Sequence, residues 1–197
     1  MKKIFLATKN KGKIKEMKEI LSDISDIEVY SILDGFDIPD VVEDGNTFEE
    51  NSIKKALEIS KFLNMYVIAD DSGISAEALD GRPGIYSARY AGLNATDDEN
   101  NKKLIEDMKG KDNRTVKYVA VITCASPDGR TLSVEGDVYG TLLEEAQGSN
   151  GFGYDPFFFV EEYQVTFGEL ESEIKNKISH RGKALAELKK GIKEFII

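Results

Sequence analysis

Short apolar runs alternate with amphipathic stretches along this chain, and that alternation limits the folds that it can adopt. Residues 3–8 and 66–69 have the length and apolar content of buried strands, while residues 13–21 carry apolar side chains at helical spacing. Thr47 and Thr96 each precede a glutamate by three residues at the start of a further amphipathic stretch. We therefore predict helices over residues 13–21, from Thr47 to about residue 63 and after Thr96, within an α/β fold.

The second half of the chain adds antiparallel structure. Two β-rich segments, residues 114–125 and 131–139, flank a Pro-Asp-Gly-Arg turn, which predicts a hairpin. A loop over residues 148–156 is followed by a strand candidate at 157–160, and Ser179 can cap a terminal helix. The apolar stripe of that helix is Leu185, Leu188, Ile192, Phe195 and Ile196. Together these elements predict a mixed sheet.

Length and charge narrow the class of protein. With 197 residues, 41% of them hydrophobic and 31% charged, the chain is expected to fold by itself as one domain with two lobes, residues 1–197. A net charge of -10 argues against a nucleic-acid partner, which would require a basic face. A small polyanion in a local basic pocket is compatible with it.

Three further features bear on compartment and metal. No apolar run approaches the roughly 20 residues of a membrane helix, and the start lacks a secretory signal, so we expect a cytoplasmic protein without a membrane partner. The single cysteine, Cys124, falls in an apolar strand pattern and is expected in the core. Since His180 is the only histidine, oxygen ligands must dominate any metal site, which indicates magnesium-type chemistry.

The first candidate site is the turn between the first strand and the first helix. Helix N-termini present unpaired amides and the positive end of the dipole, which suits phosphate. The glycine and lysine spacing of a P-loop is absent, and a solvated basic turn has the same composition. The residues of this phosphate candidate are Thr8, Lys9, Asn10, Lys11, Gly12 and Lys13.

Acidic residues form the second candidate. Glu43 and Asp44 precede the second helix, and Asp70 and Asp71 follow the strand at 66–69. Neighbouring acids are costly unless a cation lies between them, and hard divalent cations prefer carboxylate and phosphate oxygens. We expect the acids at the carboxyl end of the strand, where Gly73 lets the backbone turn. The alternative is an acidic loop and an ordinary Asp-Ser-Gly turn.

Lys55 is the third candidate. It follows Asn51 by four residues, so both side chains can project from one face of the second helix. A solvated helix lysine is the alternative.

The loop over residues 148–156 is the fourth candidate. It contains three glycines, two aromatic residues and Asp155, and an accessible ring can stack on a nucleobase. Asp155 can accept a hydrogen bond from a base N–H. An aromatic loop that closes the edge of the core is the competing interpretation.

Basic residues near the terminal helix are the fifth candidate. His180 and Arg181 lie in its first turn, where their charge opposes the helix dipole, and Lys175 precedes them. His180 and Arg181 can both donate to a carbonyl acceptor such as the O6 of a deaminated purine. A structural histidine with satisfied hydrogen bonds is the alternative.

Five segments in this order resemble the inosine triphosphate pyrophosphatase family over nearly the whole chain. They are LATKNKGKIKE, EDGNTFEENSIKKA, IADDSGISAEALDGRPGIYSARYAG, GFGYDPFF and KNKISHRGKAL. The resemblance implies an elongated α/β fold with a long mixed sheet flanked by helices, two lobes around a central cleft, and a homodimer. Asn150 departs from the family pattern, because a glycine usually occupies its position in the loop, although Asn tolerates left-handed dihedrals.

The resemblance also implies an activity, the hydrolysis of ITP, dITP or XTP to monophosphate and pyrophosphate. Water would attack the α-phosphorus, with Asp71 as proton acceptor and Mg2+ bound by Glu43 and Asp71. Ser72 would contact substrate. Thr8, Asn10, Lys13 and Lys55 would hold the triphosphate. Phe152, Gly153, Tyr154, Asp155, Lys175, His180 and Arg181 would form the base pocket.

Two other functions stay open at this point. A Maf-type nucleotide pyrophosphatase has a related fold, but its N-terminal Ser-Pro-Arg pattern is absent from this chain. A nucleotide-sensing module without catalysis would gain little from acids at positions 43 and 71, because acids repel polyanions unless a metal intervenes.

Overall fold

The computed structural model describes residues 1–196, which divide into two compact units. Unit 1 comprises Met1–Asp71, Ala120–Gly136 and the described residues from Arg181 onwards, and unit 2 comprises Ser72–Val119 and Asp137–His180. The chain therefore passes between the units four times, and two of these passages separate residues of the predicted site, Asp71 from Ser72 and His180 from Arg181.

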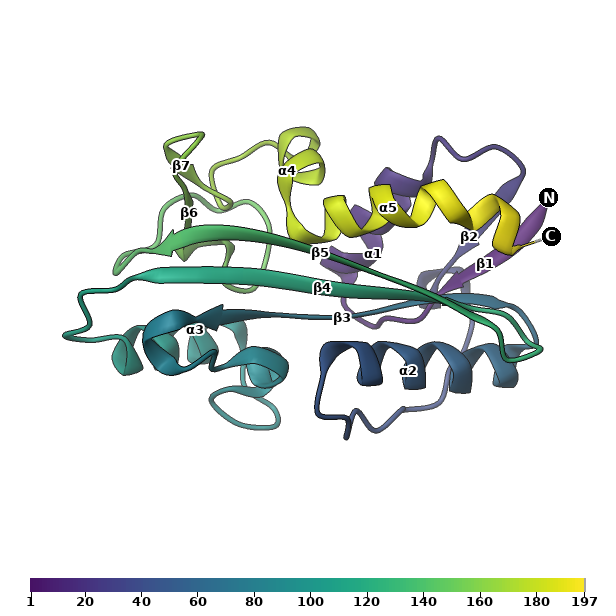
Figure 1. The fold of residues 1–197 in the computed structure, drawn as a ribbon, viewed down its shortest axis with the longest axis horizontal. Helices are drawn as coiled ribbons and strands as arrows, with labels where there is room; N and C mark the ends of the chain where they lie inside the picture. Colours follow the sequence, from purple (N-terminus) through teal and green to yellow (C-terminus); the bar gives the residue numbers. More distant parts are fainter. Residues whose placement is uncertain (197) are drawn as a thin grey trace. The chain divides into compact units, whose positions relative to one another are not determined.

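Over the described residues, seven strands are hydrogen-bonded in the order β2-β1-β3-β4-β5-β6-β7 (Figure 1). β1 pairs in parallel with β2 and β3, whereas β6 pairs antiparallel with β5 and β7. The sheet is mixed, as predicted. The strands are β1 Lys2–Leu6, β2 Ile27–Tyr30, β3 Tyr66–Ala76, β4 Thr115–Ala125, β5 Thr131–Leu142, β6 Phe158–Val160 and β7 Val165–Thr166.

Five α-helices accompany the sheet in residues 1–196. They are α1 Lys11–Leu21, α2 Phe48–Leu63, α3 Asp97–Asp107, α4 Ser172–Ile178 and α5 His180–Phe195. In unit 1, α1 and α5 cover one face of the strands and α2 covers the other (Figure 1). The predicted class, a mixed sheet flanked by helices, is confirmed.

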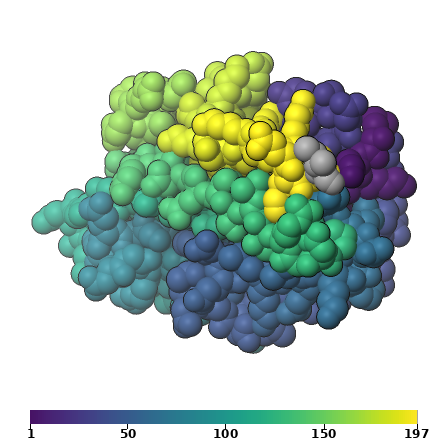
Figure 2. Space-filling view, turned by 45° about the vertical axis from the view of Figure 1, so that its right-hand side comes forward, coloured from purple at the N-terminus to yellow at the C-terminus, as the bar shows by residue number. Residues whose placement is uncertain are grey.

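Alternation along β1 explains the two-sided core of unit 1. Ile4 and Leu6 pack with the buried residues of α1 and α5, and Phe5 between them packs with those of α2. Successive strand residues point to opposite faces, so an apolar strand covered on both sides has a continuous apolar sequence. The predicted stripe of α5 lies in this core. The other face of α5 carries exposed Lys183, Glu187 and Lys190 and lies at the surface (Figure 2).

Unit 2 has a separate core that is rich in aromatic rings. The ring of Phe158 lies 4.6 Å from that of Tyr118 and 4.8 Å from that of Phe167. Leu104 packs α3 against this cluster, and Met108 at the C-cap adds to it. Offset and tilted aromatic pairs of this kind add to the stabilisation from buried area.

Side-chain caps set the helix starts, with one difference from prediction. Thr47 caps α2 and Thr96 caps α3, where Glu99 Oε2 accepts in return from Thr96 N and completes a capping box. At α2 the corresponding residue, Glu50, accepts from Asn46 N and not from Thr47 N, so the capping box is not formed. α1 begins at Lys11, two residues earlier than predicted, because the Asn10 side chain accepts from the Lys13 amide and caps the helix.

The prediction that a strand ends before Asp70 is wrong. β3 continues through Asp70, Asp71 and Gly73 to Ala76, so neither acid lies at a strand terminus or in a turn. Gly73 does not bend the chain. A Cβ at that position would lie 2.4 Å from Gly84 O and 2.4 Å from Ser87 Oγ, so glycine allows a close approach to the strand.

The predicted hairpin is formed by β4 and β5, with Ser126 N donating to Arg130 O across the turn. Cys124 is fully buried in the core of unit 1, as expected. β2 and α4 were not predicted, because β2 is half-buried and α4 is only seven residues long, so neither has a clear periodicity. Within residues 1–196, no helix has the length and apolar character that crossing a membrane requires.

Candidate active site

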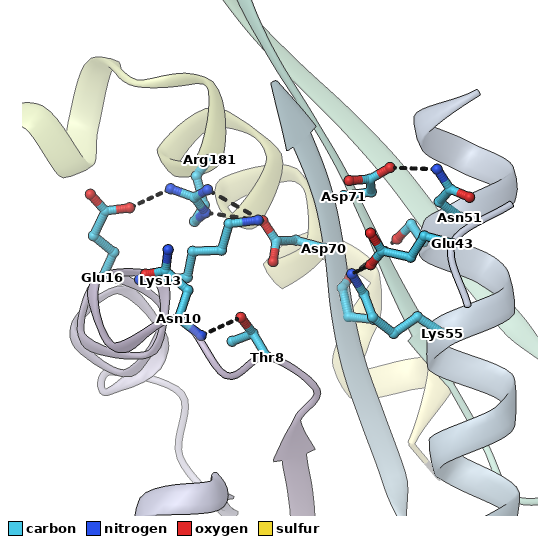
Figure 3. A network of polar contacts seen from close by, with 12 residues as sticks. Thr8, Asn10, Lys13, Glu16, Glu43, Asn51, Lys55, Asp70, Asp71 and Arg181 are labelled. Carbon is cyan, nitrogen blue, oxygen red and sulfur yellow. Dashed lines mark hydrogen bonds and ion pairs between the residues drawn. The ribbon is translucent and has the colours of Figure 1, made fainter. Parts of the chain in front are cut away.

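The phosphate candidate at the start of α1 divides into residues that build the turn and residues that face solvent. Asn10 Oδ1 accepts from Lys13 N at 3.1 Å, and Asn10 N donates to Thr8 Oγ1 at 3.2 Å. Lys9 pairs with exposed Asp40, and Lys11 is exposed in the first turn. Gly12 lies inside the helix rather than in the predicted loop. Lys13, by contrast, is directed to Asp70 inside the protein (Figure 3).

Lys13 belongs to a buried ionic network in unit 1. Its Nζ lies 2.9 Å from Asp70 Oδ2, and Arg181 Nη2 lies 3.3 Å from the same oxygen. Arg181 Nη1 is 2.5 Å from Glu16 Oε2 (Figure 3). Arg181 was predicted in the base pocket, but its guanidinium lies between Glu16 and Asp70. Glu16 was missed, and the only hint in the sequence is an acid one turn after Lys13 on the same helix.

The charges of the network shift the pKa values of Asp70 and Lys13. Burial opposes the charged form of Asp70, but the positive charges of Lys13, Arg181 and Lys55 outweigh it and hold the pKa of Asp70 well below its usual range. Burial lowers the pKa of Lys13, and the charge of Asp70 opposes that shift. Burying charges is costly unless each has close partners, so these side chains depend on one another.

Asp71, next along β3, has a different environment in the same unit. Its Oδ2 accepts a hydrogen bond from Asn51 Nδ2 of α2 at 2.9 Å. Lys55, one turn later on α2, forms an ion pair with Glu43 (Figure 3). Burial raises the pKa of Asp71, the bond from Asn51 opposes that rise, and the charge of Glu43 adds to it. Adjacent acids on one strand therefore have pKa values shifted in opposite directions.

The donor set near Asp71 fits a hard divalent cation with few protein ligands. Across residues 1–196, no three His, Cys, Asp or Glu side chains are grouped so that they could hold a metal. Glu43 and Asp71 are close enough for the charge of one to raise the pKa of the other. Two carboxylates with the remaining positions filled by water and phosphate oxygens are typical of Mg2+ bound with a nucleotide.

The predicted base loop lies in unit 2 and is held from inside. Asp155 is buried, and its Oδ2 accepts from Lys175 Nζ at 2.6 Å and from Phe152 N at 2.9 Å. Tyr154 is also buried and donates to Ser87 O at 2.7 Å. In this structure both residues build the loop, so Tyr154 does not present its ring for stacking. Phe152 is half-buried, with Lys175 Nζ 5.0 Å from its ring centroid.

Glycines and Asn150 shape the same loop. A Cβ on Gly151, whose φ is +76°, would lie 2.1 Å from Asp155 Oδ2, so only glycine fits beside that carboxylate. Asn150, where the family pattern has glycine, is not among the described residues with positive φ. Its amide donates to Leu170 O and its backbone N–H to Gly168 O. Asparagine therefore introduces no backbone strain at this position.

His180 lies in unit 2 with its ring stacked on Tyr118, 4.5 Å between centroids and 6° between planes. It is buried, which agrees with the structural interpretation of this residue and leaves its part in binding a prediction. Ser72 follows Asp71 on β3 and is half-buried.

Comparison with known proteins matches residues 4–191 to the model of the Ham1 family. The chain belongs to the Ham1 family. Proteins named dITP/XTP pyrophosphatase from Desulfotalea psychrophila and Clostridium perfringens are each 50% identical, over 94% and 100% of this chain and 83% and 100% of their own lengths. The resemblance found in the sequence is thus confirmed.

Solved Ham1 structures have the same fold. The HAM1 protein of Coxiella burnetii superposes with a TM-score of 0.88 at 39% identity, covering 98% of this chain and 100% of its own. The Staphylococcus aureus Ham1 protein gives 0.85 at 42% identity, with 98% and 99% covered. At these identities the shared fold extends over nearly all of both chains.

Proposed function

We propose that this Ham1 protein hydrolyses deaminated purine nucleoside triphosphates, namely dITP, ITP and XTP, to the monophosphate and pyrophosphate. The observation that carries the proposal is the pair of carboxylates, Glu43 and Asp71, set among Lys55, Lys13 and Asn51 in unit 1. Acids that would repel a polyphosphate lie beside lysines that would attract it. Relatives that are half identical carry the name dITP/XTP pyrophosphatase, which supports the same substrates here.

Magnesium is the proposed cofactor, with Glu43 and Asp71 as its protein ligands. A bound Mg2+ supplies positive charge against the phosphate oxygens and polarises the phosphorus towards attack. The lysines would share this role: Lys55 would turn from Glu43 towards the triphosphate, and Lys13 lies at the N-terminus of α1, where backbone amides and Asn10 and Thr8 favour anions. Lys9, Lys11 and Gly12 line the same turn.

Asp71 is the proposed proton acceptor. Burial raises its pKa, which makes its carboxylate a better base than an exposed aspartate. Water forms a new bond to the α-phosphorus, the bond from that phosphorus to the bridging oxygen breaks, and pyrophosphate leaves with the bonding electrons. The proton released by water passes to Asp71. Asn51 keeps the carboxylate oriented through its hydrogen bond.

Base recognition is proposed for unit 2. Phe152 would offer its ring to the purine, while Gly153 permits the close approach of the base. Lys175 and His180 carry N–H donors that suit the O6 carbonyl of inosine and xanthine and mismatch the amino group of adenine. Tyr154 and Asp155 would act by shaping the loop, Arg181 by holding Asp70 and Lys13, and Ser72 by contacting substrate.

A product assay tests the proposal against its rivals. The protein is incubated with Mg2+ and a panel of dITP, ITP, XTP, ATP and pyrimidine triphosphates, and the products are identified. We expect monophosphate and pyrophosphate from the deaminated purines, and none without divalent metal. Preference for pyrimidine nucleotides would indicate a Maf-type enzyme, and binding without turnover would indicate a sensing module. Equal hydrolysis of ATP and ITP would contradict the proposed base recognition.

We further propose a cytoplasmic homodimer built from one domain with two lobes around a cleft, without nucleic-acid or membrane partners. The net charge of -10 supports the absence of a nucleic-acid partner. Sedimentation equilibrium tests the dimer, since a mass near the 21.9 kDa of one chain would contradict it.

A further inference from the structure

The start of α3 forms hydrogen bonds with both backbone polar groups of Gly153 in the base loop. Asp97 Oδ2 accepts from Gly153 N at 2.7 Å, and Asn101 Nδ2 donates to Gly153 O at 3.0 Å. Asp97 and Asn101 are four residues apart, so they share one face of the helix. Gly153 has a φ of +63°, a conformation that most side chains disfavour. All three residues belong to unit 2.

Asn101 has the properties of a residue kept for function rather than for stability. It is only 6% exposed, and its Oδ1 is a buried atom with no hydrogen-bond partner in residues 1–196. A buried amide that leaves one polar atom unsatisfied is less favourable than an apolar side chain of similar shape. The hydrogen bond to Gly153 O is therefore what an asparagine provides here.

The preceding residue, Asn100, gives a matched contrast. It is also buried, but its Oδ1 accepts from Ala91 N at 2.8 Å and its Nδ2 donates to Ala88 O at 3.2 Å. Both ends of that amide are satisfied by the segment before α3, as in an ordinary structural asparagine. Adjacent asparagines on one helix thus serve different segments, and only Asn101 bonds the base loop.

Gly153 directly follows Phe152, whose ring is proposed to meet the base. Phe152 N donates to Asp155 Oδ2 on the other side of the residue. Phe152 therefore has its preceding peptide held by Asp155 and its following peptide region held by α3. Its ring lies next to Lys175, with Nζ 5.0 Å from the ring centroid.

We infer that Asp97 and Asn101 are positioning residues for nucleobase recognition, which act by holding the Phe152–Gly153 backbone in its binding conformation. The inference rests on the proposed function, in which Phe152 meets the purine. A loop that is already ordered avoids the entropic cost of ordering on binding, so affinity for the base falls when the clamp is removed. The phosphate-binding residues of unit 1 do not contribute to the clamp.

Asn101→Leu is the primary test. We expect the KM for dITP to rise about tenfold, which corresponds to the free-energy cost of ordering one side chain and its backbone on binding. The kcat should change by less than about twofold. Inhibition by inorganic tripolyphosphate, which has no base, should keep its Ki. The melting temperature should change little, because removal of the unsatisfied Oδ1 offsets the loss of the hydrogen bond to Gly153 O. A purely structural asparagine would instead lower the melting temperature when replaced.

Asp97 provides a second test at an exposed position, where folding is not at risk. Asp97→Ala should raise the KM for dITP, and Asp97→Asn, which keeps an acceptor oxygen for Gly153 N, should restore it towards the unaltered value. Asp98→Ala is the control, since Asp98 is an exposed acid in the same turn and no hydrogen bond joins it to the loop within the described chain.

An unchanged KM for dITP in both Asn101→Leu and Asp97→Ala would overturn the inference. So would a parallel rise in the KM for dITP and the Ki for tripolyphosphate, because the clamp would then not be specific to the base. Failure of the unaltered protein to hydrolyse any purine triphosphate would overturn the proposed function instead, so the two failures are distinguishable.

Discussion

The two units hold their candidate site residues in place by different physical means. In unit 1, the charges of Lys13, Glu16, Asp70 and Arg181 are buried together and neutralise one another. In unit 2, the base loop is held chiefly by hydrogen bonds between side chains and backbone, with Asp155 and Lys175 forming a buried ion pair beneath it. Unit 1 is thus organised by charge and the loop of unit 2 by backbone geometry.

This difference determines how each region should respond to mutation. Removing one buried charge leaves its partners uncompensated in a region of low dielectric constant, which is expensive. Removing one hydrogen bond to the backbone usually costs about 1 kcal/mol. Single changes should therefore destabilise the network in unit 1 strongly, whereas single changes around the loop of unit 2 should lower stability only slightly.

The largest effect is expected for Asp70→Asn. The substitution leaves Lys13 and Arg181 without the carboxylate between them, so the free energy of unfolding should fall by about 3–5 kcal/mol. Urea denaturation measures this change. Asp40→Asn, which removes the exposed partner of Lys9, is the control and should leave stability unchanged. Equal effects of the two substitutions would show that burial does not govern the network.

The pH dependence of stability sharpens the same point. Because the pKa of Asp70 is lower in the folded protein than its unfolded value of about 3.9, its charge stabilises the fold above that pH. The contribution is lost as the pH falls towards the folded pKa. The gap in urea midpoint between the unaltered protein and Asp70→Asn should therefore shrink between pH 5 and pH 3. A constant gap would contradict the assigned pKa shift.

Asp71→Asn should affect turnover instead of folding. We expect kcat to fall by at least about a hundredfold, because the proposed proton acceptor is lost. Stability at pH 7 should not decrease, since burial raises the pKa of Asp71 and its charge is disfavoured in the folded state. Steady-state kinetics and urea denaturation on the same preparation separate the two effects. Near-normal turnover would remove Asp71 from the mechanism.

In unit 2, Phe152→Ala tests the ring that is proposed to meet the base. Loss of a stacking surface worth about 1–3 kcal/mol should raise the KM for dITP by about tenfold or more. Turnover at saturation should change less, because the residues proposed to bind phosphate and metal lie in unit 1. An unchanged KM would mean that another surface binds the purine.

The smallest effect is expected for Tyr154→Phe. Loss of the hydrogen bond to Ser87 O should lower the free energy of unfolding by about 1 kcal/mol and leave the KM for dITP nearly unchanged. Thermal or urea denaturation with parallel kinetics gives both values. A large rise in KM with unaltered stability would return Tyr154 to the base pocket.

Local patterns in the sequence determined much of the fold. Thr47 and Thr96 start α2 and α3 because a hydroxyl three residues before a free amide caps a helix regardless of its surroundings. The apolar stripe of α5 and the two-sided core around β1 follow from periodicity. The order of the motifs also determined the family, which a match over residues 4–191 confirmed.

The tertiary structure decided which polar residues meet. β3 continues through Asp70 and Asp71 because Lys13, Arg181 and Asn51 pair with their carboxylates inside the protein. The sequence predicts these acids at the end of the strand because a charged carboxylate without such partners requires water. Arg181 is 111 residues from Asp70. The hydroxyl of Tyr154 can be buried because it donates a hydrogen bond to the backbone oxygen of Ser87, 67 residues away in the chain. Hydrogen bonds and ion pairs depend on the distance between side chains in space, and a local sequence pattern does not contain that distance.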